Sequence, residues 1–235
     1  MLDINRHKLF MLQILKDIYS NPLLAVNLGF KGGTACMFFH NLPRFSVDLD
    51  FNLINADYED QIYDTVRTIL LKYGKIHDEA KKFYGPILVL DYGAGDRKLK
   101  VEISKRDFGD KYVIANLLGL NIKLMAKENM FAHKLCAMLD RNEITNRDIF
   151  DCWFYMENRT PINRKVVEQR MGKPLETYLQ DCIDRLNSMS DRGMLNGLGE
   201  LMDDDMKKFV KTKLRKEAIQ LLEFYKLCPI EASEK

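Results

Sequence analysis

The segment from Gly29 to Ile54 constrains this chain more than any other part of the sequence. It reads GFKGGTACMFFHNLPRFSVDLDFNLI, a pattern that predicts a strand, a glycine-rich turn, a short helix and a second strand, in that order. The second strand carries Asp48 and Asp50. Because side chains alternate along a strand, both carboxylates are expected on the same face, about 7 Å apart.

Two carboxylates on one face of a strand repel each other unless a cation lies between them. A hard divalent cation, Mg²⁺ or Mn²⁺, accepts oxygen ligands from both, and nucleotide phosphates can complete its coordination. Upstream, Gly32 and Gly33 allow backbone amides to approach phosphate oxygens, and the Thr34 hydroxyl is a further donor. Each feature alone is also typical of an ordinary turn or strand end. Their order within one segment indicates a metal-dependent nucleotide site.

The composition is typical of a folded protein without a large excess of positive or negative charge. The 235 residues, of which 46% are hydrophobic and 30% charged, suffice for one large domain or two small ones. A net charge of +2 means that any nucleic-acid contact has to come from a local basic patch. Five scattered cysteines predict buried or free thiols, not a disulfide framework or a zinc site. Without a signal-peptide core or an apolar run near ~20 residues, we expect a cytoplasmic protein with no membrane contact.

Two later runs predict a β-hairpin, Ile87 to Tyr92 and Leu99 to Ser104, joined by Gly93-Ala94-Gly95-Asp96. In the second run the polar side chains, Glu102 among them, alternate with apolar ones. Glu102 is therefore expected on the polar face of that strand.

The second half of the chain has helical periodicity. The predicted helices are Lys127 to Leu139, one that Asn146 caps, Asn163 to Met171, Pro174 to Met189 and Asp203 to Leu227. The last of these carries a dense basic run, which is typical of a solvated face and is also the one dense patch available for an RNA backbone: Lys207, Lys208, Lys211, Lys213, Arg215 and Lys216. Aromatic residues are not interleaved with this run, so it does not predict base stacking.

Two signatures resemble a known family. The stretch from GGTA to RFSVDLDF resembles the AbiEii-type nucleotidyltransferases, toxin components of bacterial toxin–antitoxin and abortive-infection systems within the DNA-polymerase-β-like nucleotidyltransferase superfamily. The stretch AHKLCAMLDRNEITNRDIFD resembles the family's second signature, a helix lysine followed by Arg-Asp-x-x-Asp. Together they cover about residues 25 to 155, and the C-terminal helices match no motif.

The resemblance implies an α/β fold, α+β in stricter terms. A small mixed β-sheet flanked by helices would form the nucleotidyltransferase core at residues 1–126. A helical C-terminal region at residues 127–235 would complete the nucleotide cleft.

The resemblance also implies a third carboxylate from a strand next to that of Asp48 and Asp50, and Glu102 is the candidate. All three would be catalytic, either as ligands of Mg²⁺ or, in the case of Glu102, as the base for the acceptor hydroxyl. The alternative for Glu102 is an exposed strand residue paired with Lys100 or Lys98.

For the second signature, the resemblance implies that Lys134 supplies a point charge that binds the triphosphate. Asp148 would orient Lys134 or act on the incoming hydroxyl, and Asp151 would be architectural, although which of the two acids faces the site stays open. Arg44 and Ser46 complete the nucleotide-binding candidates with Gly32, Gly33 and Thr34, and both could equally brace the loop before the strand.

By resemblance, the reaction is transfer of a nucleoside monophosphate from an NTP to an acceptor hydroxyl, with release of pyrophosphate. The role would be that of a toxin that modifies tRNA and is restrained by a cognate antitoxin. Two alternatives stay open: small-molecule nucleotidylation of the antibiotic-modifying type, and a non-catalytic nucleotide-binding interaction module. The basic last helix favours RNA over a small molecule, and three clustered acids favour catalysis over binding alone.

Overall fold

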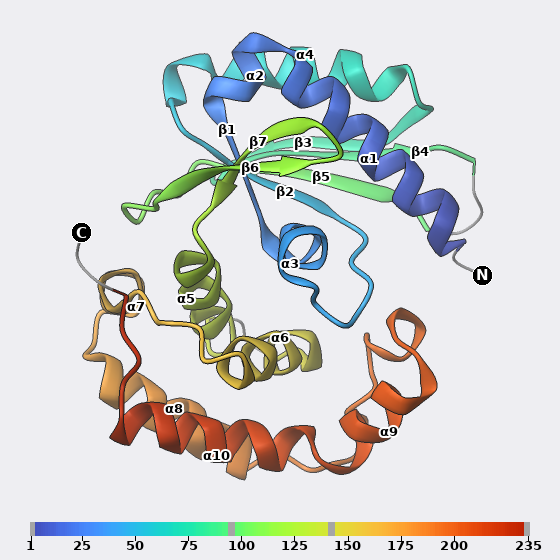
Figure 1. The fold of residues 1–235 in the computed structure, drawn as a ribbon. Coiled ribbons are helices and arrows are strands. Elements are labelled where there is room, and N and C mark those ends of the chain that lie inside the picture. Colours follow the sequence, from blue (N-terminus) through green and yellow to red (C-terminus); the bar gives the residue numbers. More distant parts are fainter. Residues whose placement is uncertain (1–2, 94–96, 141–143, 233–235) are drawn as a thin grey trace. The chain divides into compact units, whose positions relative to one another are not determined.

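The computed structural model describes residues 3–93, 97–140 and 144–232, and the chain divides into two compact units. The first unit comprises Met1–Asn41, Phe45–Asp107 and Lys111–Met125. The second comprises Leu42–Arg44, Phe108–Asp110 and Ala126–Lys235. Figure 1 shows that the first unit combines a sheet with helices and the second is helical, which confirms the predicted α/β class. The predicted division of function between residues 1–126 and 127–235 stays a prediction.

A mixed sheet forms the first unit. Among the described residues it has seven strands in the order β3-β4-β5-β2-β1-β7-β6. The strands are β1 (Leu28–Lys31), β2 (Leu49–Leu53), β3 (Lys75–Lys82), β4 (Gly85–Asp91), β5 (Leu99–Ser104), β6 (Tyr112–Leu117) and β7 (Leu120–Met125). Strand β2 runs parallel to β5 and antiparallel to β1. The strand that carries Asp50 is therefore an interior strand, paired on both sides.

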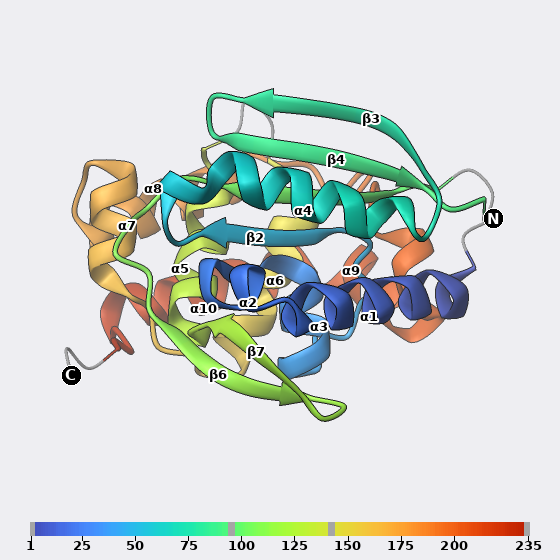
Figure 2. The same cartoon turned by 90° about the horizontal axis from the view of Figure 1, so that it is seen from above.

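Helices cover both faces of this sheet. Figures 1 and 2 show α1 (Ile4–Ser20), α2 (Pro22–Asn27) and α4 (Glu59–Leu71) on one face and α3 (Gly32–His40) on the other. A short 3₁₀ helix, η1 (Ala56–Tyr58), precedes α4. The helical spacing of buried side chains such as Met11, Ile14 and Ile18 turns one face of α1 towards the core.

Several local expectations for the first unit need correction. The first strand begins at Leu28, directly after a helix that Pro22 starts and the Asn21 side chain caps. Asp48 lies immediately before β2 and not within it. The predicted hairpin is present as β4 and β5, while residues 94–96 of its turn lie outside the described residues.

The second unit contains α5 (Lys127–Ala137), α6 (Asn146–Glu157), α7 (Arg164–Met171), α8 (Leu175–Asn187), the 3₁₀ helix η2 (Gly199–Leu201), α9 (Asp204–Thr212) and α10 (Leu214–Leu227). Helices α8 and α10 lie side by side, and α10 also packs on α6. Three fully buried tyrosines mark the core: Tyr155, Tyr178 and Tyr225. No described helix combines the length and the apolar surface needed to cross a membrane.

Two predictions for the helical unit are wrong in detail. The expected helix from Asp203 to Leu227 is broken at Lys213, just after Thr212 donates its hydroxyl hydrogen to the Lys208 carbonyl oxygen. Such a bond to the residue four positions back bends helices. Thr145, and not Asn146, caps α6, because its side chain accepts the amide hydrogen of Asp148.

Candidate active site

Strand pairing brings the predicted metal ligands together in the first unit. In the parallel pair of β2 and β5, Asp50 lies directly opposite Glu102. Asp48 stands two residues before Asp50, and its charge acts on Asp50 together with that of Glu102. Because paired strands lie about 4.8 Å apart, side chains at opposed positions contact the same small region. The three carboxylates therefore form one group, here called the acid cluster.

Gly32 lies against the acid cluster, at the turn between β1 and α3. Its φ of +82° is one that side chains other than glycine rarely adopt. A Cβ atom at this position would lie 2.5 Å from Oδ2 of Asp50. Glycine is thus required both by the backbone conformation and by the close approach of the Asp50 carboxylate.

Gly33 and Thr34 occupy the first turn of α3, and both are buried. The Thr34 hydroxyl donates its hydrogen to the backbone carbonyl oxygen of Asp48. A hydroxyl has one hydrogen to donate, so Thr34 positions the Asp48 backbone in this structure instead of offering a donor to a phosphate. The backbone amides of the first turn stay suited to an anion by their position at the helix N-terminus.

Lys100 connects two of the three acids. Its Nζ lies 2.9 Å from Oε2 of Glu102 and 4.0 Å from Oδ2 of Asp48. The structure shows the Lys100 pair of the alternative, at a half-buried Glu102, while the catalytic role of Glu102 stays a prediction.

The lysines do not fully offset the cost of burying the Asp50 charge. Burial raises the pKa of Asp50, and the neighbouring Asp48 and Glu102 raise it further, while Lys100 and Lys31 act in the opposite direction. Burial also raises the pKa of Glu102, but the hydrogen bond and charge of Lys100 outweigh it, so that the net pKa of Glu102 is lowered. At Asp50, burial and the two neighbouring carboxylates outweigh Lys100 and Lys31, which leaves this carboxylate attractive to a further cation.

The donor set fits a magnesium-type ion that a substrate helps to hold. Among the described residues, no three His, Cys, Asp or Glu side chains are gathered into a ready metal cage. Mg²⁺ usually takes one or two protein carboxylates and completes its octahedron with water and substrate phosphates. Asp48 and Asp50 could supply oxygen ligands of that kind, with Glu102 beside them.

The second signature builds a separate group in the helical unit, here called the paired cluster. Lys134 of α5 places Nζ 2.8 Å from Oδ2 of Asp151 and 3.3 Å from Oδ1 of Asp148. Arg44 donates two hydrogen bonds to Asp151, from Nε at 2.6 Å and from Nη2 at 2.7 Å. The other oxygen of Asp148 accepts the Thr145 hydroxyl hydrogen at 2.7 Å.

Charge is balanced in the paired cluster. Burial alone would raise the pKa of Asp151, but Arg44 and Lys134 outweigh it and hold that pKa at about 2. Burial alone would lower the pKa of Lys134, but Asp151 and Asp148 raise it. Two carboxylates face two cations, an arrangement that favours a bracing role for Arg44 and Asp151. Ser46, the other loop candidate, is buried in the first unit.

His7 is a residue near the acid cluster that the sequence analysis missed. Its Nε2 lies 2.8 Å from the backbone oxygen of Val47, and its Nδ1 contacts the Tyr92 hydroxyl. Burial lowers the pKa of His7, so the neutral ring donates from Nε2 to Val47 and accepts at Nδ1 from Tyr92. His7 shares the helical face of Met11 and Ile14, and this spacing was the available signal for its burial.

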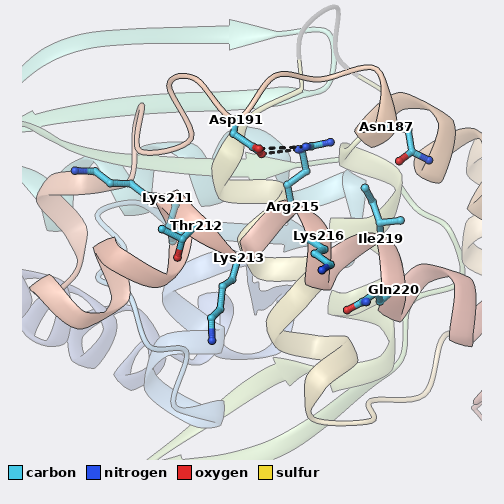
Figure 3. A pocket seen from close by; sticks show the side chains of 10 residues that line it. Asn187, Asp191, Lys211, Thr212, Lys213, Arg215, Lys216, Ile219 and Gln220 are labelled. Carbon is cyan, nitrogen blue, oxygen red and sulfur yellow. Dashed lines mark hydrogen bonds and ion pairs between the residues drawn. The ribbon is translucent and has the colours of Figure 1, made fainter.

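The basic run of the last two helices borders a pocket of about 360 Å³. Figure 3 shows its lining from the end of α8, from α9 and from α10, with Arg215 bound to Asp191. The Nε–Oδ1 distance of that pair is 2.6 Å. Lys211, Lys213 and Lys216 also line the pocket and form no ion pair within the described part of the chain.

Comparison with known proteins gives a family match and several similar solved structures. Residues 13–223 match the family model described as nucleotidyl transferase AbiEii toxin, type IV toxin–antitoxin system. JHP933 from Helicobacter pylori has a TM-score of 0.57 at 20% identity, covering 95% of each chain. A Helicobacter pylori protein provisionally assigned as a nucleotidyltransferase has a TM-score of 0.55 at 22% identity, covering 95% of this chain and 98% of its own. At these identities the two structures support the fold. No curated protein matches the chain.

Proposed function

The chain belongs to the AbiEii family of nucleotidyltransferase toxins of type IV toxin–antitoxin systems, and on that premise we propose that it transfers a nucleoside monophosphate from an NTP to a hydroxyl of tRNA. The acceptor oxygen would form a new bond to the α-phosphorus as the bond to the leaving pyrophosphate breaks. The observation that carries this proposal is the acid cluster, in which Asp50 and Glu102 lie opposite each other on paired strands.

Within the proposal, Asp48 and Asp50 hold a divalent cation, Mg²⁺ or Mn²⁺, and Glu102 lies beside it. Such an ion, when bound, neutralises charge on the phosphates of the NTP. Glu102 accepts the proton of the acceptor hydroxyl. Its low pKa makes it a weak base, so positioning contributes more to this step than basicity.

The turn after β1 would bind the triphosphate. The close packing of Gly32 on Asp50 brings the backbone amides at the start of α3 next to the acid cluster. Thr34 acts by holding the Asp48 backbone. Lys134 is proposed as the point charge for the triphosphate, kept protonated and oriented by Asp148 and Asp151.

The pocket at the α9–α10 break supports an RNA acceptor. Lysines without an ion pair in the described residues suit a phosphate backbone, because they release counterions on binding. A small-molecule acceptor has no need of such a surface. Membership in a type IV system also implies an antitoxin as the partner that restrains the activity.

The decisive experiment is a transfer assay with total tRNA, Mg²⁺ and each α-labelled NTP in turn. We expect label on tRNA with the intact protein and about 10²- to 10³-fold less with Asp50→Asn, which keeps the side-chain shape and removes the charge. Chelation of the divalent cation is expected to abolish transfer.

Asp78→Asn is the matched control, because Asp78 is an exposed acid on the edge strand β3, and its activity is expected to equal that of the intact protein. Transfer that survives Asp50→Asn would contradict the assignment of the acid cluster. If label reached a small molecule and never RNA, the acceptor would be that small molecule instead of tRNA.

A further inference from the structure

Two large aromatic side chains stand exposed at the turn between β3 and β4. Phe83 is 86% exposed and Tyr84 57% exposed. Their ring centroids lie 5.0 Å apart in an edge-to-face arrangement. The guanidinium carbon of Arg106 lies 5.0 Å from the centroid of the Tyr84 ring. Together, Phe83, Tyr84 and Arg106 form what we call the aromatic platform.

The backbone of the platform is anchored next to the end of the strand that carries Glu102. The amide of Lys105, just past the end of β5, donates a 2.8 Å hydrogen bond to the carbonyl oxygen of Tyr84. The next residue, Gly85, has a φ of +119°, and a Cβ there would lie 2.0 Å from the carbonyl oxygen of Ile103. Exposed aromatic rings on an anchored turn offer a large contact area, and they lose little conformational freedom when a ligand binds.

The platform also lies close to the acid cluster within the same unit. Ile87 of β4 pairs with Glu102 of β5, and Tyr84 precedes Ile87 by three residues, about 10 Å along the strand. The charge of Arg106 is among those that lower the pKa of Glu102, after burial and the nearer lysines. The arginine therefore lies over the Tyr84 ring and is near enough to the cluster for its charge to act on Glu102.

The strand order places the proposed triphosphate site and the proposed acceptor site on opposite sides of β2. The glycine turn follows β1 on one side of β2, whereas β5 and β4 lie on the other side. In phosphoryl transfer the attacking and leaving oxygens lie roughly in line across the reacting phosphorus. With the triphosphate at the glycine turn, the acceptor approaches from the side of β5 and β4.

We propose that Phe83, Tyr84 and Arg106 bind an unpaired base at the single-stranded end of the RNA acceptor. This inference rests on the proposed function for the direction from which the acceptor arrives. Aromatic side chains stack on any base, and an arginine over such a ring adds attraction for the base and its phosphate. The neighbouring Lys82 is exposed and has no ion pair within the described residues.

The test measures binding in the absence of NTP, so that it does not depend on transfer. The probe is a short single-stranded RNA with a free 3′ hydroxyl and 2-aminopurine near that end, titrated with the full chain. The double variant Phe83→Ala/Tyr84→Ala is expected to raise the Kd by about 5- to 150-fold, the range measured for the loss of base stacking. Phe83→Trp is expected to retain binding, because an aromatic face is preserved.

Leu118→Ala serves as the matched control. Leu118 is 83% exposed in the β6–β7 turn, at the opposite edge of the sheet, and its loss should change the Kd by less than about twofold. An unchanged Kd for the double variant, or no binding of the probe by the intact chain, would overturn the proposal. An unchanged Kd for RNA with a raised KM for NTP would also overturn it, because the platform would then bind the base of the NTP.

Transfer of label separates this inference from the proposed function. If the intact chain binds RNA through the platform but transfers nothing to any RNA, the proposed function fails and the platform stands. If platform variants bind and transfer as well as the intact chain, the platform fails and the proposed function stands.

Discussion

The acid cluster and the paired cluster have similar side chains and a different balance of charge. In the first unit Lys100 acts on the carboxylates of Asp48, Asp50 and Glu102, Lys31 acts on the last two of these, and Arg106 also acts on Glu102. In the second unit two carboxylates face two cations: Asp148 and Asp151 against Arg44 and Lys134. The pKa of the half-buried Asp50 is raised, whereas that of the fully buried Asp151 is held at about 2.

This difference distinguishes a cluster that stabilises the fold from a cluster that is suited to bind a ligand. A buried carboxylate with two bonded cations is satisfied by the protein itself, and removing it leaves those cations without compensation. A buried carboxylate beside other carboxylates is stabilised by a cation from outside. The acid cluster is therefore the better candidate for binding a metal ion, and the two acids of the paired cluster hold Arg44 and Lys134 within their own unit.

The largest expected effect distinguishes the two clusters by stability. Asp151→Asn leaves Arg44 and Lys134 buried without their shared charge, and should lower the free energy of unfolding by about 3–5 kcal/mol. Asp50→Asn removes a charge that burial already disfavours, and should leave the stability unchanged or raise it. Urea denaturation at pH 7 measures both. An equal loss in the two variants would show that the acid cluster is as well compensated as the paired cluster.

A smaller effect is expected at acid pH. The folded pKa of Asp151 is about 2 and the unfolded value about 3.9, so its contribution to stability is present above about pH 4 and is lost as the pH falls towards 2. The loss is on the order of 2 kcal/mol. Urea titrations at several pH values between 5 and 2.5 measure it. The Asp151→Asn variant, where it folds, should lack this part of the pH dependence.

The smallest effect concerns the cation that the acid cluster already contacts. Lys100→Met makes the cluster more negative, and a unit charge about 4 Å away in water is worth about 1 kcal/mol. We therefore expect Mn²⁺ to bind about fivefold more tightly in calorimetric titrations without nucleotide. Lys105→Met, which removes a lysine paired with Glu59, is the control. Weaker Mn²⁺ binding by Lys100→Met would instead indicate that Lys100 orients the carboxylates for the ion.

Local patterns predicted much of the first unit. A continuous apolar run predicted β4, an alternation of polar and apolar residues predicted β5, and the glycine turn was placed correctly before α3. Strand β3 was missed, because its sequence KIHDEAKK has no apolar face and it lies at the edge of the sheet. The exposed Phe83 and Tyr84 follow this strand, so their role could not be considered without it.

The sequence by itself determined the family and the fold class. Two short signatures contain the characteristic residue types, at spacings that place them on one face of a strand or helix. It also identified Asp48, Asp50, Glu102 and Lys134 as residues of interest. Only the tertiary structure determined which of these residues lie close enough to shift each other's pKa. The register of β2 on β5 sets Asp50 opposite Glu102, and the fold brings Arg44 to Asp151, 107 residues away in the sequence. Burial and pairing depend on such distant contacts, and no local pattern encodes them.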